Sequence, residues 1–125
     1  QTASPSETPF LVQQLVDNQE YRLENAATDE EKLESILDTH IQFERIHPFS
    51  DGNGRTGRML MNYSLLQKGF PPLIIEKETK ATYIELLAKQ DLDGFMSFAK
   101  EILAKEQKRM KAFQNMDQEQ IKQIE

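Results

Sequence analysis

The large apolar residues of this chain recur every three or four positions along most of its length, the repeat of helices that bury one face. From that spacing and the breaks between the runs, the sequence predicts helices over 8–23, 28–45, 53–68, 77–90 and from 91 onward. A short extended stretch at 73–75 joins the third helix to the fourth. No internal repeat and no pair of strands stands out, so the predicted fold class is all-α, a compact helical bundle.

Capping residues mark the starts of the first two helices. Thr8 followed by Pro9 suits a helix start, because threonine caps N-termini and proline fits the first helical position. Thr28 and Glu31 form a capping box, in which each side chain bonds a backbone N–H that the helix leaves unpaired.

The remaining boundaries are set by glycine, proline and aspartate. Gly69 ends the third helix, and Pro71 and Pro72 confirm the stop. Asp91 or Asp93 begins the last helix. Residues 1–7 are small and polar and predict a flexible lead-in, whereas 106–125 have helical propensity but few apolar residues. We therefore expect one domain over residues 1–125, with an extended C-terminal helix.

Charge, cysteine content and the length of apolar runs limit which partners and which cell compartment the sequence predicts. The 125 residues carry a net charge of −6, which argues against a nucleic-acid or anionic-membrane surface. Cysteine is absent, which excludes disulfides and thiolate metal sites and fits a cytoplasmic protein. No apolar run approaches the roughly 20 residues that a membrane span needs. The chain begins at Gln1 rather than methionine, so we expect a processed chain or an excised piece.

Chemistry is concentrated in residues 47–58, HPFSDGNGRTGR, between the second and third predicted helices. Gly52, Asn53 and Gly54 stand at the start of a helix, where several backbone N–H groups can point at one anion. Such a nest suits a phosphate group.

Charged residues around this nest extend the prediction. Arg55 and Arg58 are three positions apart on one helix face, and two guanidinium groups suit a polyphosphate. Asp51 would repel bare phosphate unless it held Mg²⁺, which is commonly bound by one carboxylate plus phosphate oxygens. His47 is a candidate general base at neutral pH. The residues alone thus suggest Mg²⁺-nucleotide chemistry.

Three other interpretations of the segment fit less well. Residues 52–57 match the dinucleotide fingerprint G-x-G-x-x-G, but that fingerprint follows a strand, and here a helix precedes it. A calcium loop starting at Asp51 would place Arg55 and Thr56 where an oxygen ligand and a glycine belong, and Asn62 where it needs glutamate. A plain turn with solvated arginines would not require the histidine and aspartate as well.

The segment resembles the signature of the Fic family, H-x-F-x-[D/E]-G-N-G-R-x-x-R, at every fixed position. The resemblance extends to His40, Phe43 and Ile46 before the motif and to the Gly69-Phe-Pro-Pro turn after it, covering about residues 8–105. It implies a helical Fic core that transfers AMP from ATP to a Ser, Thr or Tyr hydroxyl of a target protein. Pyrophosphate would be released.

Roles follow from the motif positions. The resemblance implies that His47 deprotonates the target hydroxyl and that Asp51 holds Mg²⁺ on the α- and β-phosphates. Residues 52–54 would form the anion hole, while Arg55 would contact the β-phosphate and Arg58 the γ-phosphate.

Two residues on the fourth predicted helix, Tyr83 and Gln90, resemble positions of the family's base pocket. A tyrosine on an apolar helical stripe is also an ordinary core residue, and both interpretations stay open. His40 falls on the core face of its helix, which predicts a buried structural histidine.

Two features of the family are missing from this sequence. Fic enzymes usually carry a β-hairpin flap upstream, and residues 1–7 leave that flap absent or cut short. The inhibitory pattern [S/T]-x-x-x-E-[G/N], whose glutamate pairs with the final motif arginine, is also absent: Glu24 precedes Asn25, but Glu20 stands four before it. We expect an inhibitory segment upstream, or a separate antitoxin, to supply a glutamate to Arg58.

Two alternative functions remain. A Doc-like kinase uses the same fold to transfer the γ-phosphate, but it carries lysine where this chain has Gly54. A nucleotide-binding regulatory module without catalysis would not need every catalytic position filled. The sequence leaves open the target protein, the nucleotide preference and whether the chain forms a homo-oligomer.

Overall fold

The structure, a computed structural model, describes residues 7–46 and 52–124, and within these ranges it contains helices and no strands. The helices are α1 Thr8–Asn25, α2 Asp29–Ile46, α3 Asn53–Gln67, the 3₁₀ turn η1 Lys77–Thr79, α4 Lys80–Lys89 and α5 Leu92–Ile124. The all-α prediction is confirmed, and 73–75 belongs to neither a helix nor a strand.

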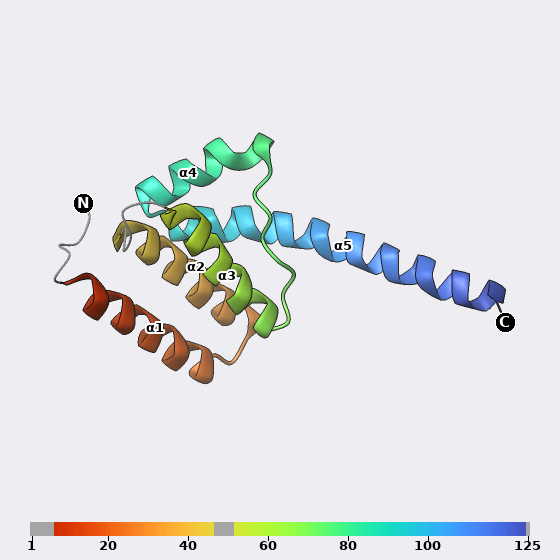
Figure 1. Cartoon of the computed structure of the whole chain (residues 1–125), viewed down its shortest axis with the longest axis horizontal. Coiled ribbons are helices and arrows are strands. Elements are labelled where there is room, and N and C mark those ends of the chain that lie inside the picture. The colour runs from red at the N-terminus through yellow and green to blue at the C-terminus, as the bar shows by residue number, and fades with distance from the viewer. Residues whose placement is uncertain (1–6, 47–51, 125) are drawn as a thin grey trace.

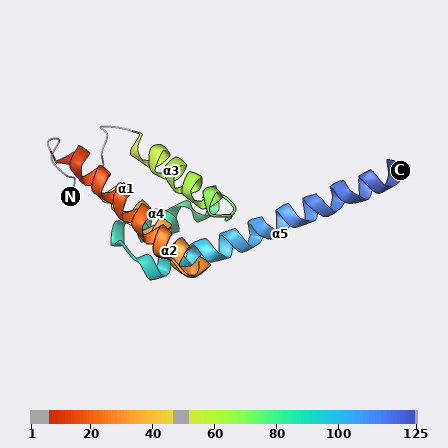
Figure 2. The ribbon, with the colours of Figure 1, turned by 90° about the horizontal axis from the view of Figure 1, so that it is seen from below.

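Helix α2 is the centre of the bundle. It packs against α1, α3 and α5, and α4 lies on α5 (Figures 1 and 2). Its buried side chains follow helical spacing and face several neighbours: Leu33, Ser35, Ile36, Leu37, His40, Ile41, Phe43 and Ile46. Because each fully buried aliphatic side chain contributes about 1.5–3 kcal/mol, this helix anchors the fold.

Residues from α3, α4, α5 and the segment after α3 complete the core around that helix. α3 supplies Met61 and Leu65, and the extended segment after α3 supplies Leu73. From α4 and α5 come Tyr83, Phe95, Met96, Ala99 and Leu103. α1 has no fully buried residue, so it covers the core from outside.

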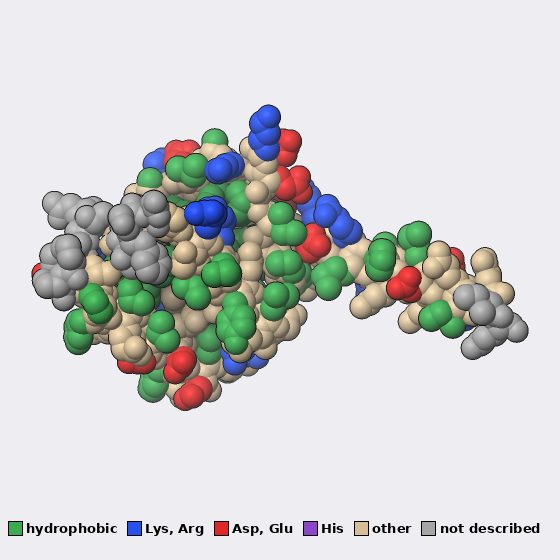
Figure 3. All heavy atoms as spheres, in the orientation of Figure 1, with side chains coloured by type: hydrophobic (Ala, Val, Ile, Leu, Met, Phe, Trp, Pro, Cys, Tyr) green, Lys and Arg blue, Asp and Glu red, His purple; other side chains and the backbone are tan. Residues whose placement is uncertain are grey.

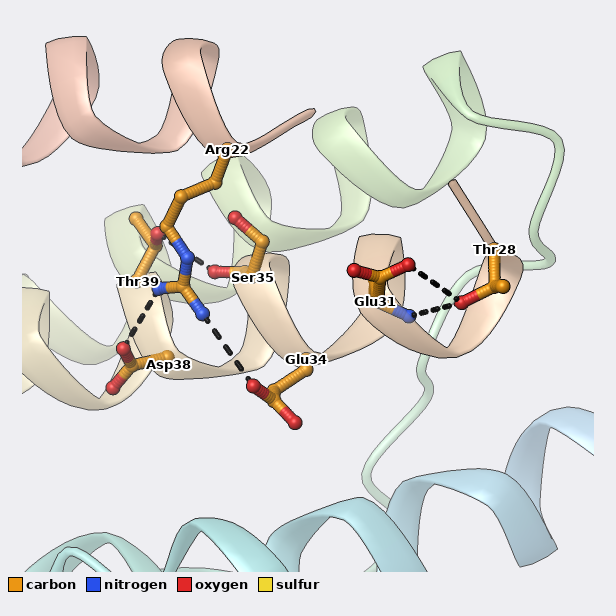
Figure 4. A network of polar contacts seen from close by, with 7 residues as sticks. All are labelled: Arg22, Thr28, Glu31, Glu34, Ser35, Asp38 and Thr39. Atoms are coloured by element: carbon orange, nitrogen blue, oxygen red, sulfur yellow. Dashed lines mark hydrogen bonds and ion pairs between the residues drawn. The ribbon is translucent and has the colours of Figure 1, made fainter. Parts of the chain in front are cut away.

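The capping box predicted at the start of α2 is present (Figure 4). The Glu31 N–H donates to Thr28 Oγ1 at 3.1 Å, and the Ala27 N–H donates to Glu31 Oε1 at 3.1 Å. The start of α1 differs slightly from the prediction, because Thr8 is the first helical residue and Glu7 occupies the N-cap position.

The predicted ends of α3 and start of α5 are confirmed. Gly69 adopts φ +86°, a left-handed conformation that glycine reaches without strain. Of the two aspartates proposed to begin α5, Asp91 is the cap, because its Oδ1 accepts the Gly94 N–H at 2.9 Å.

Side chains of α1 tie it to α2 and α3. Arg22 binds the Asp38 carboxylate at 2.8 Å and lies 3.8 Å from Glu34, as Figure 4 shows. Gln19 Nε2 donates to Ser64 Oγ on α3 at 3.2 Å. These polar contacts compensate in part for the shallow apolar burial of α1.

The last part of α5 projects away from the bundle (Figures 1 and 2). Its apolar side chains Met110, Phe113, Met116 and Ile121 are exposed, and green side chains are visible along this projection in Figure 3. Helix α5 continues to Ile124, so the chain beyond residue 106 is helical as predicted. No helix in the described ranges has the length and apolar character that crossing a membrane requires.

Candidate functional site

The described part of the glycine-rich segment begins at Gly52, while His47 and Asp51 lie outside the described residues. Gly52 has φ +72°, which glycine adopts readily, and this turn starts α3 at Asn53 as predicted. The Thr56 N–H donates to the Gly52 carbonyl at 3.0 Å and closes the first turn. The positive end of the α3 dipole therefore coincides with the predicted anion nest.

The guanidinium groups of both motif arginines lie close to the glycines of this first turn. A Cβ added at Gly52 would lie 3.5 Å from Arg55 Nη2, and one added at Gly54 would lie 3.0 Å from Arg58 Nη1. The two guanidinium groups therefore stand beside the helix N-terminus, and the glycines leave them room. Two cations next to a row of backbone N–H donors can bind a polyphosphate.

Gly57 lies at a tight contact between α3 and the Phe43 and Glu44 side chains of α2. A Cβ on Gly57 would collide with Glu44 Oε1 and lie 3.1 Å from Phe43 Cδ1. Glu44 Oε1 is buried and has no hydrogen-bond partner within the described ranges. Burial raises the pKa of the Glu44 carboxyl, and the positive charge of Arg58 opposes that rise.

His40 is buried, as its position on the core stripe predicted, with 2% of its surface exposed. Its Nε2 lies 2.6 Å from the Tyr83 hydroxyl, and both rings pack near Phe95. Burial, reinforced by the charge of Arg58, lowers the pKa of His40 to about 4, although the Gly57 backbone favours the protonated ring. His40 is therefore neutral at physiological pH.

The Tyr83 hydroxyl also lies within hydrogen-bonding reach of Arg58. Burial raises the pKa of Tyr83 to about 12, while the Arg58 hydrogen bond opposes this and Glu44 adds to it. Arg58 consequently has two environments, with the α3 N-terminus on one side and the His40, Glu44 and Tyr83 side chains on the other.

The two residues predicted for the base pocket are in different surroundings. Tyr83 is 2% exposed and belongs to the core cluster, whereas Gln90 is exposed at the left-handed end of α4. Their contact with a nucleotide base stays a prediction.

The sequence did not single out Glu44. Its signal was available, because Glu44 follows His40 by four positions and so shares its helix face. Gly57 was similarly counted only as part of the motif, although it is the residue that lets Glu44 approach α3.

A separate cavity of about 350 Å³ lies between α1, α2 and α3. Its walls are mostly apolar and include Leu15, Leu23, Ile36, Phe43, Leu60 and Met61. It reaches His40 and Gly57, but neither arginine lines it. The polar chemistry of the candidate site is thus outside this cavity, across the contact between α2 and α3.

Comparison with known proteins identifies the family. The family model described as Fic/DOC family matches residues 1–65. A solved structure of a Fic domain containing signaling protein from Bacteroides thetaiotaomicron superposes with a TM-score of 0.72 and 30% sequence identity. That match covers 82% of this chain and 44% of the other.

Curated relatives give the same assignment. The protein adenylyltransferase fic-1 of Caenorhabditis briggsae is 31% identical over 97 residues, covering 78% of this chain and 19% of the relative. The protein adenylyltransferase Fic of Aedes aegypti is 52% identical over 62 residues, covering 47% of this chain and 12% of the relative. The chain thus spans a fifth or less of the length of these relatives. On the family match, the superposed fold and the motif at the start of α3, the chain belongs to the Fic/DOC family.

Proposed function

We propose that this chain is the catalytic core of a protein adenylyltransferase that moves AMP from ATP to a Ser, Thr or Tyr hydroxyl of a target protein. The observation that carries the proposal is the pair of guanidinium groups, Arg55 and Arg58, held over the glycines of the α3 N-terminus. Its relatives are named protein adenylyltransferases, which supports the same activity.

In this proposal the described residues bind and orient the triphosphate. Backbone N–H groups of residues 52–54 bind phosphate oxygens, Arg55 binds the β-phosphate and Arg58 the γ-phosphate. Two arginines leave part of the triphosphate charge uncompensated, so a divalent cation fits this donor set. Asp51 would hold that Mg²⁺, which supplies further charge neutralisation when bound.

His47 would accept the proton of the target hydroxyl as its oxygen bonds to the α-phosphorus. The bond from that phosphorus to the bridging oxygen breaks, and pyrophosphate leaves with the electron pair. The remaining residues contribute by positioning and by charge, which are large terms in reactions of this kind.

Gly54 distinguishes this proposal from the kinase alternative. Since a Cβ there would already lie 3.0 Å from Arg58 Nη1, a lysine would force Arg58 to move. The observed pair of Gly54 and Arg58 therefore supports AMP transfer over γ-phosphate transfer.

Incubation with a lysate and ATP labelled at either the α- or the γ-phosphate tests the proposal. We expect Mg²⁺-dependent label on protein from α-labelled ATP and none from γ-labelled ATP. Label from γ-labelled ATP alone would assign the kinase reaction. If ATP bound but neither label reached any protein across lysates of several sources, a regulatory module would be the better assignment.

We also propose that the reaction is restrained through Arg58 by a glutamate from another segment or an antitoxin. A carboxylate paired with Arg58 would compete with the γ-phosphate for the same guanidinium group. Adding the candidate segment should suppress transfer, and replacing its glutamate should restore it.

A further inference from the structure

The proposed reaction does not use the buried, hydrogen-bonded pair of His40 and Tyr83. Both side chains are 2% exposed, they come from different helices, and 2.6 Å separates His40 Nε2 from the Tyr83 hydroxyl oxygen. A buried polar pair costs stability unless it is fully bonded, so an apolar pair would serve the core equally well. The pair lies close to Arg58, which suggests another use.

The chemistry of arginine fixes the direction of one hydrogen bond in the group, and burial of the tyrosine proton favours the direction of the next. A guanidinium has donors and no acceptor, so the Tyr83 oxygen must accept from Arg58. Donation of the single Tyr83 proton to an unprotonated His40 Nε2 avoids leaving that buried proton unpaired. The proton of the neutral imidazole therefore resides on Nδ1.

The other side of the imidazole agrees with that assignment. Nδ1 has no hydrogen bond of good geometry in the described ranges, but the Gly57 backbone lies close enough to favour a protonated ring. Gly57 directly precedes Arg58 in α3. His40 and Tyr83 thus lie between two neighbouring residues of α3, with Gly57 near His40 and Arg58 near Tyr83.

We propose that Tyr83 is a positioning residue that holds the Arg58 guanidinium in place for the terminal phosphate, and that His40 orients the Tyr83 hydroxyl. The proposal rests on the proposed function only in the ligand given to Arg58. Tyr83 itself would touch no part of the nucleotide, in contrast to a role in the base pocket.

The benefit is preorganisation of a flexible side chain. A free arginine loses rotamer freedom when it binds phosphate, and a hydrogen bond formed beforehand removes part of that loss. Glu44 complements the arrangement, since its carboxylate balances the charge of Arg58 and its Oε1 accepts no hydrogen bond within the described chain. Supporting groups of this kind set the precision of a binding site.

Nucleotide titration of the Tyr83→Phe variant separates the two roles of Tyr83. We expect ATP to bind about three- to ten-fold more weakly, the loss of one ordinary hydrogen bond, and AMP to bind as in wild type. Equal weakening of ATP and AMP would instead place Tyr83 at the base, and unchanged ATP binding would remove any role; either result overturns the proposal. Tyr21→Phe, at a tyrosine that is 68% exposed on α1, is the matched control.

A double-mutant cycle tests whether Tyr83 acts through Arg58. In an Arg58→Ala background, Tyr83→Phe should have no further effect on ATP binding. Independent, additive losses would contradict the proposal. Circular dichroism of each variant confirms that the helices are intact.

A measurement on the unmodified protein needs neither a variant nor a nucleotide. Imidazole ¹⁵N shifts of the free chain should show His40 as the neutral Nδ1–H tautomer at pH 7. The Nε2–H tautomer would exclude the donor order that the proposal requires. If wild type failed to bind ATP, the proposed function would fail, and this tautomer would still decide whether Tyr83 donates to His40.

Discussion

His40 and Tyr83 are 43 positions apart in the sequence, yet their side chains meet at 2.6 Å in the core, beside the arginine that closes the motif. The contact joins α2 to α4, and Arg58 brings α3 to the same point. The packing of these three helices therefore also places Arg58, a residue of the proposed phosphate site. Variants that disturb this point should change stability and nucleotide binding together.

Stability should fall as the pH is lowered from about 6.5 toward 4. Burial lowers the pKa of His40 to about 4, whereas an unfolded histidine titrates near 6.5, so unfolding takes up a proton between these values. Because the pKa of His40 is lower in the folded state, the neutral imidazole contributes its full share of the folding free energy above pH 6.5. That contribution is lost progressively as the pH falls from 6.5 toward 4. From pH 7 to pH 5 the loss should be about 2 kcal/mol from this residue.

Urea unfolding at several pH values measures that loss. His40→Gln removes the titrating group, and the variant should be less stable at pH 7 but should show a flatter pH dependence. Equal pH slopes for the variant and wild type would show that other groups, such as carboxylates, account for the acid sensitivity.

Gly57→Ala should destabilise the protein by about 1–3 kcal/mol, the usual cost of overpacking a tight contact. The added Cβ would collide with the Glu44 carboxylate and press on Phe43. In an exposed helix, replacing glycine by alanine would stabilise the protein by up to about 1 kcal/mol. The sign of the change in unfolding free energy therefore shows whether the contact at Gly57 is tight. Thermal unfolding checks it, and Glu44→Ala combined with Gly57→Ala should recover part of the loss.

Thr28→Ala should cost about 1 kcal/mol, because the variant loses the side chain that caps the Glu31 N–H at the start of α2. Denaturant unfolding would show the change as a lower midpoint with an unchanged slope. Thr82→Ala is the comparison, at an exposed threonine inside α4, and should change stability far less. Equal effects would mean that the cap contributes nothing beyond helix propensity.

His47→Ala should reduce AMP transfer by roughly 10²–10⁴-fold, the usual contribution of a general base, while ATP affinity stays near that of wild type. Transfer from α-labelled ATP gives the first quantity and calorimetric titration the second. Loss of ATP binding together with the fold would instead make His47 structural.

The helices of this chain were predictable from local signals. Spacing of apolar residues located α2 and α3, and Thr28, Gly69 and Asp91 set their ends or those of neighbouring helices. These features depend on neighbours within a few positions, so the sequence contains all the information they need. The glycine-rich start of α3 and its two arginines were predictable for the same reason.

Contacts between distant segments were decided only by the tertiary structure. Nothing near Tyr83 in the sequence says that its hydroxyl meets His40, and nothing near Glu44 says that Gly57 leaves room for its carboxylate. Such pairings depend on how α2, α3 and α4 cross, which many side chains determine together. The sequence by itself determined which residues could bind a phosphate. Only the packing of the helices decided which side chains, His40, Glu44 and Tyr83, lie next to Arg58.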